Sequence, residues 1–239
     1  MNIYLTIDDS PSARTDDLVA FLTSRDIPAL LFVRGDNMEQ YPRAIARAIK
    51  AGMVIGNHSH SHTPAGDMSF AQWRADFEAC EALINAAYSE AGTPRTGHYY
   101  RFPYIDRGDG VRVERAFAEH GEGGFAQNDA VRRIQDYLRE NGFNQPFTNL
   151  TRDYPHDAAD CLFTYTSGDW MLTRRHLGKW PYKSVQDLID KANADETLAE
   201  QGVNHVLLMH DQAEIFDEVC ALIDYFAKKG ARFLGYDAA

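Results

Sequence analysis

The chain has 239 residues, of which 44% are hydrophobic and 25% are charged. This is the composition of an ordinary globular domain, and it excludes collagen-like and disordered chains. The formal net charge of -11 repels polyanions, so we expect no nucleic acid and no anionic membrane surface as a partner, whereas neutral or cationic substrates fit better.

The cysteines and the first residues predict a cytoplasmic location. The start of the chain has no features of a secretory signal, and no apolar run is long enough to cross a membrane. Cys80, Cys161 and Cys220 are far apart and odd in number, which suits reduced, buried thiols. A secreted domain whose signal had been removed would show the same start.

Short apolar runs predict parallel β-strands. Between these runs lie segments in which apolar residues recur every three to four positions, as they do in amphipathic helices. The alternation is typical of repeated β-α units. The expected strands are residues 3–7, 29–33, 53–55, 99–102, 124–126, 162–166, 203–209 and 232–234.

The best-marked helix begins at Ser69. Ser69 and Gln72 form the pattern of a capping box, and apolar residues at 70–87 then follow at spacings of three and four. Shorter apolar stripes predict further helices around residues 18–22, 185–192 and 215–226. We interpret all of these stripes as surfaces that pack into the core.

Eight strands that alternate with helices predict an α/β fold, a distorted (β/α) barrel of seven or eight strands similar to a TIM barrel. A doubly wound open sheet is the alternative. No repeat or linker indicates a second domain, so we expect one domain over residues 1–239. An irregular, aromatic-rich excursion around residues 120–160 is expected either to cap the substrate groove or to pack on the flank of the barrel.

Polar residues follow the carboxyl ends of several expected strands. They are Asp8 and Asp9 after the first strand, His58 and His62 after the third, Arg101 in the fourth, Asp169 and Trp170 after the sixth, and His210 after the seventh. Because the carboxyl ends of parallel strands share one face of a barrel, we expect these residues to lie close together.

Two imidazoles four residues apart and one carboxylate form a set that holds a divalent metal and leaves positions open for water and substrate. His58 and His62 are the imidazoles, and we interpret His60 between them as a bystander. Taken alone, Asp8 and Asp9 would be read as a turn or cap signal. Their shared position at strand ends favours a metallohydrolase.

Five blocks of the sequence carry a resemblance to a known family. They are Thr6-Ile7-Asp8-Asp9-Ser10-Pro11, His58-Ser59-His60-Ser61-His62, Arg101-Phe102-Pro103-Tyr104, Ser167-Gly168-Asp169-Trp170 and Leu208-Met209-His210. In this order they resemble the five motifs of the polysaccharide deacetylases, the carbohydrate esterases of family four, which include chitooligosaccharide and peptidoglycan deacetylases. Members share a distorted barrel and remove N- or O-acetyl groups from sugars with a divalent metal.

The resemblance implies a role for each matched residue. Asp9, His58 and His62 would hold one metal ion, most often zinc, with cobalt, nickel or manganese as alternatives. Asp8 would be the base that Arg101 orients, and Asp169 would pair with the acid His210. The backbone N–H of Tyr104 would bind the oxyanion, and Trp170, Leu208 and Pro103 would contact the substrate.

These residues together predict a hydrolase of carbohydrate metabolism that acts on carbon-nitrogen bonds other than peptide bonds and releases acetate from an acetylated sugar or short oligosaccharide. We expect a short, neutral or weakly cationic substrate. One alternative is a related metal-dependent hydrolase of a small non-sugar amide. The other is a non-catalytic barrel that binds metal or sugar, which would lack the base or the acid, whereas Asp8, Arg101 and His210 are all present here.

Overall fold

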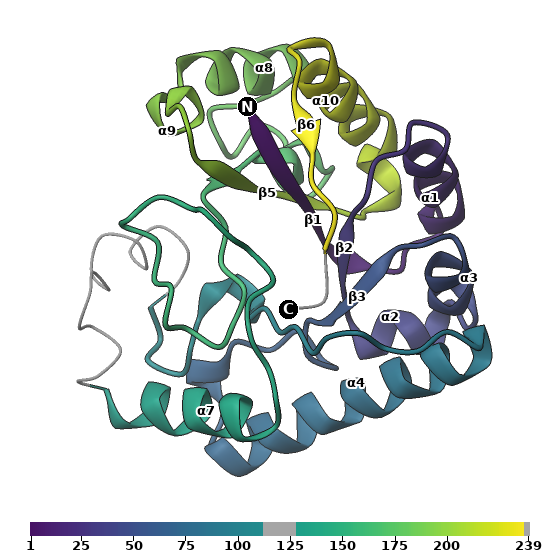
Figure 1. Ribbon diagram of the computed structural model, residues 1–239, viewed down its shortest axis with the longest axis vertical. Helices are drawn as coiled ribbons and strands as arrows, with labels where there is room; N and C mark the ends of the chain where they lie inside the picture. The colour runs from purple at the N-terminus through teal and green to yellow at the C-terminus, as the bar shows by residue number, and fades with distance from the viewer. Residues whose placement is uncertain (112–127, 237–239) are drawn as a thin grey trace.

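The computed structural model describes residues 1–111 and 128–236, and a parallel β-sheet lies at its centre (Figure 1). Within the described residues the strands are β1 (Asn2–Ser10), β2 (Leu30–Val33), β3 (Val54–Asn57), β4 (Tyr165–Thr166), β5 (Asn204–His210) and β6 (Arg232–Phe233). They form one sheet in the order β3-β2-β1-β5-β4, and β6 pairs with β1. Every pairing is parallel, so the predicted single-domain α/β class is confirmed.

Strand β1 is the centre of the sheet because it pairs with three other strands. It runs beside β5 from Asn2 to Asp8, while β6 and β2 share its other edge. Its odd-numbered side chains, including Ile3 and Ile7, enter a cluster packed against the helices, whereas Tyr4 faces an inner cluster with Phe32. Strand periodicity therefore places Asp8 on the inner side together with Tyr4.

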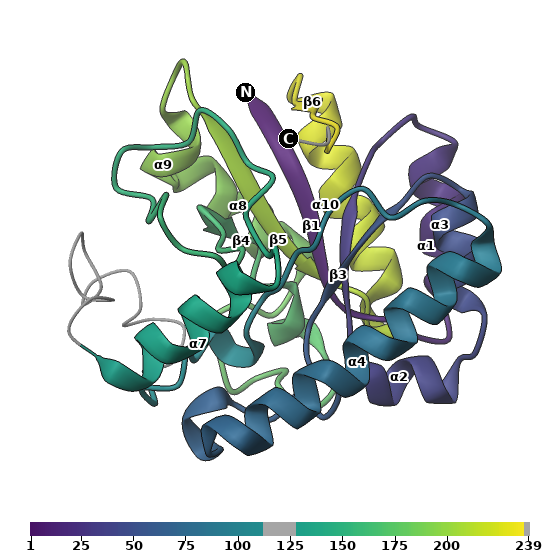
Figure 2. The ribbon, with the colours of Figure 1, turned by 60° about the horizontal axis from the view of Figure 1, so that its bottom comes forward.

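Eight helices lie in the described residues, and all but the fifth of them add side chains to the cluster on the outer side of this sheet. They are α1 (Thr15–Thr23), α2 (Gly35–Gln40), α3 (Ala44–Lys50), α4 (Phe70–Ala91), α7 (Asp129–Glu140), α8 (Val185–Ala194), α9 (Glu196–Ala199) and α10 (Phe216–Lys228). Helix α4 runs along α2 and α3 (Figure 2). It begins with the predicted capping box of Ser69 and Gln72, and it ends at Gly92, whose φ of 69° is a left-handed conformation that suits glycine.

Two irregular segments connect the edges of the sheet. Tyr100 forms an isolated parallel bridge to Asn57 of β3, and its carbonyl accepts a hydrogen bond of 2.7 Å from the N–H of Cys161. Further on, Thr164 N–H donates to Val206 O of β5 at 3.0 Å. The expected strands at 99–102 and 162–166 are thus reduced to single bridges and to β4, and the expected strand at 124–126 lies outside the described residues.

The reduction has a physical reason in the hydrogen bonding of Cys161 and Leu162. Their carbonyl groups accept hydrogen bonds from the guanidinium of Arg101, and the N–H of Leu162 donates to the hydroxyl of Tyr154. These backbone groups are satisfied by side chains instead of a neighbouring strand, so no regular ladder forms there.

The described part of the excursion has two parts. One is α7, which packs on α4, and the other is residues 147–163, which add side chains to the inner cluster of Tyr4 and Phe32. Helix α7 packs Tyr137 against Trp73 of α4, with ring centroids 5.7 Å apart. Beyond α7, the backbone carbonyls of Thr148 and Asn149 accept hydrogen bonds from Asn204 at the start of β5. Within residues 128–160, α7 therefore packs on α4, and Thr148 and Asn149 lie at the amino end of β5, whereas a cap over the substrate groove stays a prediction.

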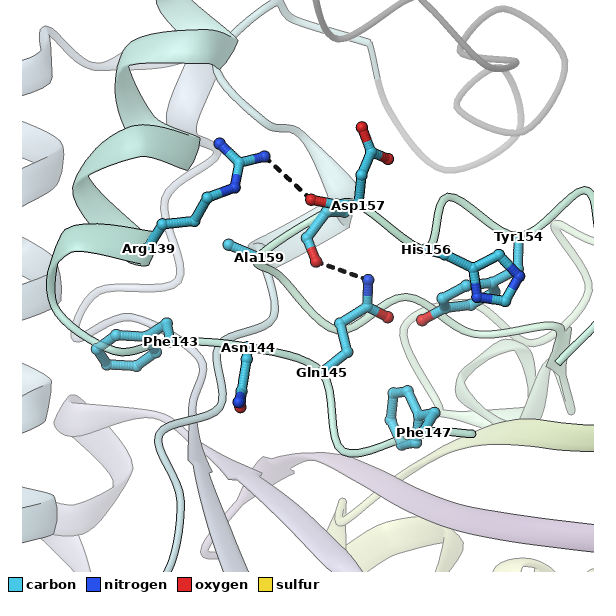
Figure 3. A pocket seen from close by; sticks show the side chains of 10 residues that line it. Arg139, Phe143, Asn144, Gln145, Phe147, Tyr154, His156, Asp157 and Ala159 are labelled. Carbon is cyan, nitrogen blue, oxygen red and sulfur yellow. Dashed lines mark hydrogen bonds between the residues drawn. The ribbon is translucent and has the colours of Figure 1, made fainter. Parts of the chain in front are cut away.

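A hollow of about 280 Å³ lies within this excursion, at the end of α7 (Figure 3). The lining residues are Arg139, Phe143, Asn144, Gln145, Phe147, Tyr154, His156, Asp157, Ala158 and Ala159. Arg139 and Gln145 donate to the carbonyls of Asp157 and Ala158, and these bonds hold the walls together.

Two further expectations concern the cysteines and the membrane. Cys80 and Cys161 are buried free thiols, as expected, whereas Cys220 is only partly buried. Over residues 1–111 and 128–236, no helix combines the length and the apolar character that a bilayer crossing requires.

The packing of Phe147 predicts that its replacement lowers the stability of the fold and leaves the dependence of kcat/KM on substrate length unchanged. Phe147 packs against Tyr4 with ring centroids 5.3 Å apart. Phe147→Ala should lower the free energy of unfolding by about 3 kcal/mol, because it removes a buried aromatic ring. Urea unfolding measures this change, and exposed Asn144→Ala in the same hollow is the matched control. If Phe147→Ala also changed the dependence of kcat/KM on sugar length, the excursion would reach the groove.

Candidate active site and metal centre

The end of β1 presents two consecutive carboxylates to one centre. Successive side chains of a strand normally point to opposite faces, but Asp9 has a φ of 67°, and the register with β2 shifts between Ile7 and Ser10. Asn37 Nδ2 donates to the carbonyl of Asp9 at 2.8 Å and holds this turn. The distortion brings the Asp9 carboxylate to 3.3 Å from Nε2 of His62, while the Asp8 carboxylate lies 3.6 Å from Nε2 of His58.

The histidine loop after β3 is held by hydrogen bonds on both sides. Nδ1 of His58 lies 2.8 Å from the carbonyl oxygen of Arg101, which assigns the proton to Nδ1 and leaves Nε2 as the free ligand atom. His62 has a φ of 57°, and its N–H donates to Ser59 Oγ at 3.1 Å. Asp76 of α4 accepts the N–H of His60 at 3.0 Å and so fixes the middle of the loop.

Asp9, His58 and His62 come together as a possible metal site. One ligand atom from each lies within 4.8 Å of the others. Oδ1 of Asp9 is buried and accepts no hydrogen bond from any residue that the structure describes, while Gln212 Nε2 donates to Oδ2 at 2.8 Å. His60 is not part of this group, because its ring contacts Glu39 at 3.2 Å. A buried carboxylate oxygen beside two imidazoles is a suitable environment for a cation.

The pKa values favour the protonation states that bind metal. Burial lowers the pKa of His62 to about 3, against the attraction of Asp9, and burial also lowers the pKa of His58. Burial opposes the charge of Asp9, but His62, His210, His58 and Arg34 together bring the pKa of this carboxyl well below its usual range. Both imidazoles are therefore neutral and the carboxylate is ionised near neutral pH.

Arg101 fixes the orientation of Asp8 from the interior of the sheet. Its side chain is fully buried, and Nη1 donates to Asp8 Oδ1 and to Thr6 Oγ1, both at 2.8 Å. The remaining donors reach the carbonyls of Cys161 and Leu162 at 2.9 and 3.0 Å. Since Oδ1 of Asp8 is engaged by Arg101, Oδ2 is the atom that faces His58.

His210 lies directly opposite Asp8 in the register of β1 and β5. Its Nδ1 is 2.9 Å from Oδ1 of Asp169, and its backbone N–H donates to Oδ2 at 2.7 Å. Burial disfavours the imidazolium, but the charge of Asp169 and its hydrogen bond outweigh burial and raise the pKa of His210 to about 9. His210 is therefore cationic near neutral pH, a state suited to a proton donor.

The other expected site residues have different surroundings. Tyr104 is 45% exposed, its ring centroid lies 4.8 Å from that of His62, and its φ is 56°. Pro103 and Leu208 are buried, and Trp170 is partly buried at the start of a 3₁₀ helix, Asp169–Leu172. Their contact with a substrate stays a prediction.

The sequence analysis missed four supporting residues. Arg34 lies 3.8 Å from the carboxylate of Asp9. Asn37 and Gln212 both donate hydrogen bonds to Asp9, and Asp76 holds the histidine loop. Gln212 stands two residues after His210, but nothing in the residue pattern distinguishes it from a loop glutamine. Asp76 belongs to an amphipathic helix, where an acidic residue on the polar side is ordinary.

Comparison with known proteins identifies the family. Residues 1–120, half of the chain, match the family model described as polysaccharide deacetylase. The chain belongs to the polysaccharide deacetylase family. A peptidoglycan-N-acetylglucosamine deacetylase of Bacillus cereus is 30% identical over 84 residues, which are 35% of this chain and 30% of that protein. A chitooligosaccharide deacetylase of Bradyrhizobium is 28% identical over 126 residues, 52% of this chain and 53% of that protein. The matches thus span about a third to a half of these relatives.

Solved structures of polysaccharide deacetylases share the fold over nearly the whole chain. A family-four carbohydrate esterase from Streptomyces lividans, in complex with acetate, has a TM-score of 0.61 at 19% identity and covers 99% of this chain and 98% of its own. A pseudoenzyme of the same family from Bacillus anthracis has a TM-score of 0.61 at 15% identity, covering 97% of this chain and 62% of its own. Because one of these two neighbours is a pseudoenzyme, the fold alone does not decide the activity.

The expected ligand set, Asp9, His58 and His62, makes a prediction about metal binding. His62→Ala should lower the affinity for a divalent metal at least tenfold, because one of three ligands is lost, while His60→Ala should bind metal like the wild type. Metal titration followed by elemental analysis measures both variants. Equal losses in the two variants would mean that the ligand pair was chosen wrongly.

The ion pair of His210 and Asp169 predicts a pH-dependent stability. The pKa of His210 is raised from 6.5 to about 9, so the pair stabilises the fold fully below about pH 6.5, and this stabilisation is lost as the pH rises through about 9. The difference in free energy of unfolding between wild type and Asp169→Asn should therefore be large near pH 6 and shrink towards about pH 10. Urea unfolding of metal-free protein measures it, and a difference independent of pH would contradict the assigned pair.

Proposed function

We propose that this chain is a metal-dependent hydrolase that removes an acetyl group from an N- or O-acetylated carbohydrate and releases acetate. One observation carries the proposal. A buried, oriented carboxylate, Asp8, and a cationic imidazole, His210, stand opposite each other in register at the end of β1 and β5, beside the three possible metal ligands. Family membership supports acetylated sugar as the substrate class.

The donor set supports a resident divalent metal. Asp9, His58 and His62 offer one ionised carboxylate and two neutral imidazoles, a combination that suits zinc and also accepts cobalt, nickel or manganese. The buried Oδ1 of Asp9 lacks a hydrogen-bond donor among the described residues, which fits a cation as its partner. When bound, such an ion supplies Lewis acidity at neutral pH.

Asp8 acts as the general base in this proposal. It takes a proton from water as the water oxygen forms a bond to the acetyl carbon. Arg101 is a positioning residue, because it holds Oδ1 of Asp8 at 2.8 Å and leaves Oδ2 for the proton. The backbone N–H of Tyr104 donates to the developing oxyanion.

His210 acts as the general acid. It transfers its proton to the leaving nitrogen, or to the leaving oxygen of an O-acetyl group, as the bond to the acetyl carbon breaks, so the products are acetate and a free amine or hydroxyl. Asp169 positions His210 through two hydrogen bonds and keeps it charged before the transfer. Trp170, Leu208 and Pro103 form the walls against which the acetyl methyl packs.

We infer a cytoplasmic site of action from the three free cysteines, because unpaired thiols are typical of reducing compartments. The expected substrate is an acetylated sugar or a short oligosaccharide. A hydrolase of small non-sugar amides and a non-catalytic barrel are the alternative outcomes of the test below.

Asp8→Asn separates catalysis from metal binding. The variant should lose turnover by about a thousandfold or more while it retains bound metal, because a carboxamide cannot accept the proton of water. Acetate release from a panel of N-acetylated sugars measures turnover, with formamide and ureide compounds as non-sugar controls. Circular dichroism checks that the variant is folded, since Arg101 loses its charged partner.

The outcomes distinguish the candidates. Near wild-type acetate release by Asp8→Asn would remove Asp8 as the base. Release from ureides alone would indicate the non-sugar hydrolase, and no turnover by the metal-loaded wild type would indicate a non-catalytic barrel. His210→Ala should slow amides more than activated esters, because an ester with a good leaving group needs less acid assistance.

A further inference from the structure

A basic segment follows the proposed acid pair along the chain. From Trp170 to Gln186 the sequence has no Asp and no Glu, although acidic residues outnumber basic ones by 35 to 24 in the whole chain. The same stretch holds four cationic residues, Arg174, Arg175, Lys179 and Lys183. This local excess of positive charge is opposite in sign to the net charge of the protein.

Ring contacts place this segment beside the site. Trp170 follows Asp169, the partner of His210, and its ring centroid lies 5.0 Å from that of His176 and 5.2 Å from that of Trp180. The hydroxyl of Thr173 also ties the segment to Trp170, because it donates a hydrogen bond of 2.8 Å to the carbonyl of Trp170. The segment therefore folds back on the residue next to the acid pair.

Two of the four cations have acidic neighbours. Glu214 accepts a hydrogen bond of 3.1 Å from the backbone N–H of Arg174, and Asp187 accepts one of 2.8 Å from the N–H of Lys183. These carboxylates offset part of the charge at both ends of the segment.

Arg175 and Lys179, between these two ends, have no such neighbour. Both are exposed, and neither forms an ion pair with any residue of the described ranges. They flank His176, whose pKa is lowered first by burial and then by these two charges. Trp180 beside them is 38% exposed, so it offers an aromatic surface at the same place.

We propose that Arg175 and Lys179, together with the exposed part of Trp180, bind an anionic substituent of the acetylated saccharide. The inference rests on the proposed function and names its substrate class, a short acetylated sugar that carries a carboxylate or a phosphate. The aromatic ring supports the apolar side of the sugar, and the two cations attract the charged group.

The net charge of -11 limits this substrate to a small number of charges. Distant charges are screened beyond about 8 Å at physiological ionic strength, so the two cations dominate the field for a group in contact with them. A long polyanion would extend beyond them into the negative field of the rest of the protein. The inferred substrate replaces the neutral or weakly cationic one that the net charge alone predicts.

The test compares two sugars that differ only in charge. The probes are an N-acetylated disaccharide with one carboxylate and the same disaccharide with that group converted to a carboxamide. The metal-loaded wild type should prefer the carboxylate by about fivefold in kcat/KM, the size expected of two exposed charge pairs, and the preference should fall as salt is added. The pair N-acetylglucosamine 6-phosphate and N-acetylglucosamine forms the second arm, which separates phosphate from carboxylate recognition.

Two double variants of equal net charge provide the matched comparison. In Arg175→Glu with Lys179→Glu, the preference should fall to one or below. In Lys50→Glu with Lys228→Glu, at exposed ends of α3 and α10, it should stay at the wild-type value. Equal rates of the wild type on charged and neutral probes, or a preference that survives Arg175→Glu with Lys179→Glu, would overturn the inference and leave the proposed function standing.

Binding to the Asp8→Asn variant gives a readout that does not depend on turnover. Calorimetric titration with the carboxylate and carboxamide disaccharides should show the same fivefold preference. Acetate release from no probe, with preferential binding retained, would count against the proposed function but support the anionic site. Acetate release from no probe and equal binding would count against both.

Discussion

The buried guanidinium of Arg101 is the interaction on which both the fold and the site depend. It joins Asp8 and Thr6 of β1 to the carbonyls of Cys161 and Leu162. The backbone carbonyl of Arg101 also accepts a hydrogen bond from Nδ1 of His58. A buried cation is costly unless all of its donors are satisfied and a counter-charge is present. Here the donors replace a strand ladder between distant segments, so the charge that orients Asp8 also connects the edges of the sheet.

Local backbone conformation has a comparable role at the proposed metal ligands. Asp9 and His62 both have φ near 60°, which is unfavourable for most residues other than glycine. Such conformations persist when surrounding hydrogen bonds hold them, and here Asn37 and Ser59 do so. The distortion at Asp9 gives consecutive residues of one strand different tasks at the same centre, with Asp8 held by Arg101 and Asp9 turned towards the imidazoles.

The charges around the site differ in sign from the net charge of the chain. The net charge of the chain is negative, yet the centre combines a cationic His210 with Arg34 and Arg101, and a basic segment packs on Trp170. Burial lowers the pKa of both His62 and His210, but the contact with Asp169 outweighs burial at His210 and raises its pKa. Composition therefore describes the long-range field, and contacts decide the chemistry.

The sequence by itself determined the parallel α/β class, the capping box of α4 and the positions at strand ends where the polar residues stand, because these follow from local periodicity and from the geometry of parallel strands. It also determined the candidate metal ligands, since residue type and spacing restrict the possible chemistry. Tertiary structure decided the rest. The left-handed turn at Asp9, the contacts of Gln212 and Asp76, and the packing of residues 147–163 against Tyr4 and Phe32 all arise between residues far apart in the chain, and no local pattern encodes them. The strand expected at 162–166 was shortened to β4 for the same reason, because the side chain of Arg101, some 60 positions away, took the carbonyls of Cys161 and Leu162 that a regular strand ladder would have used.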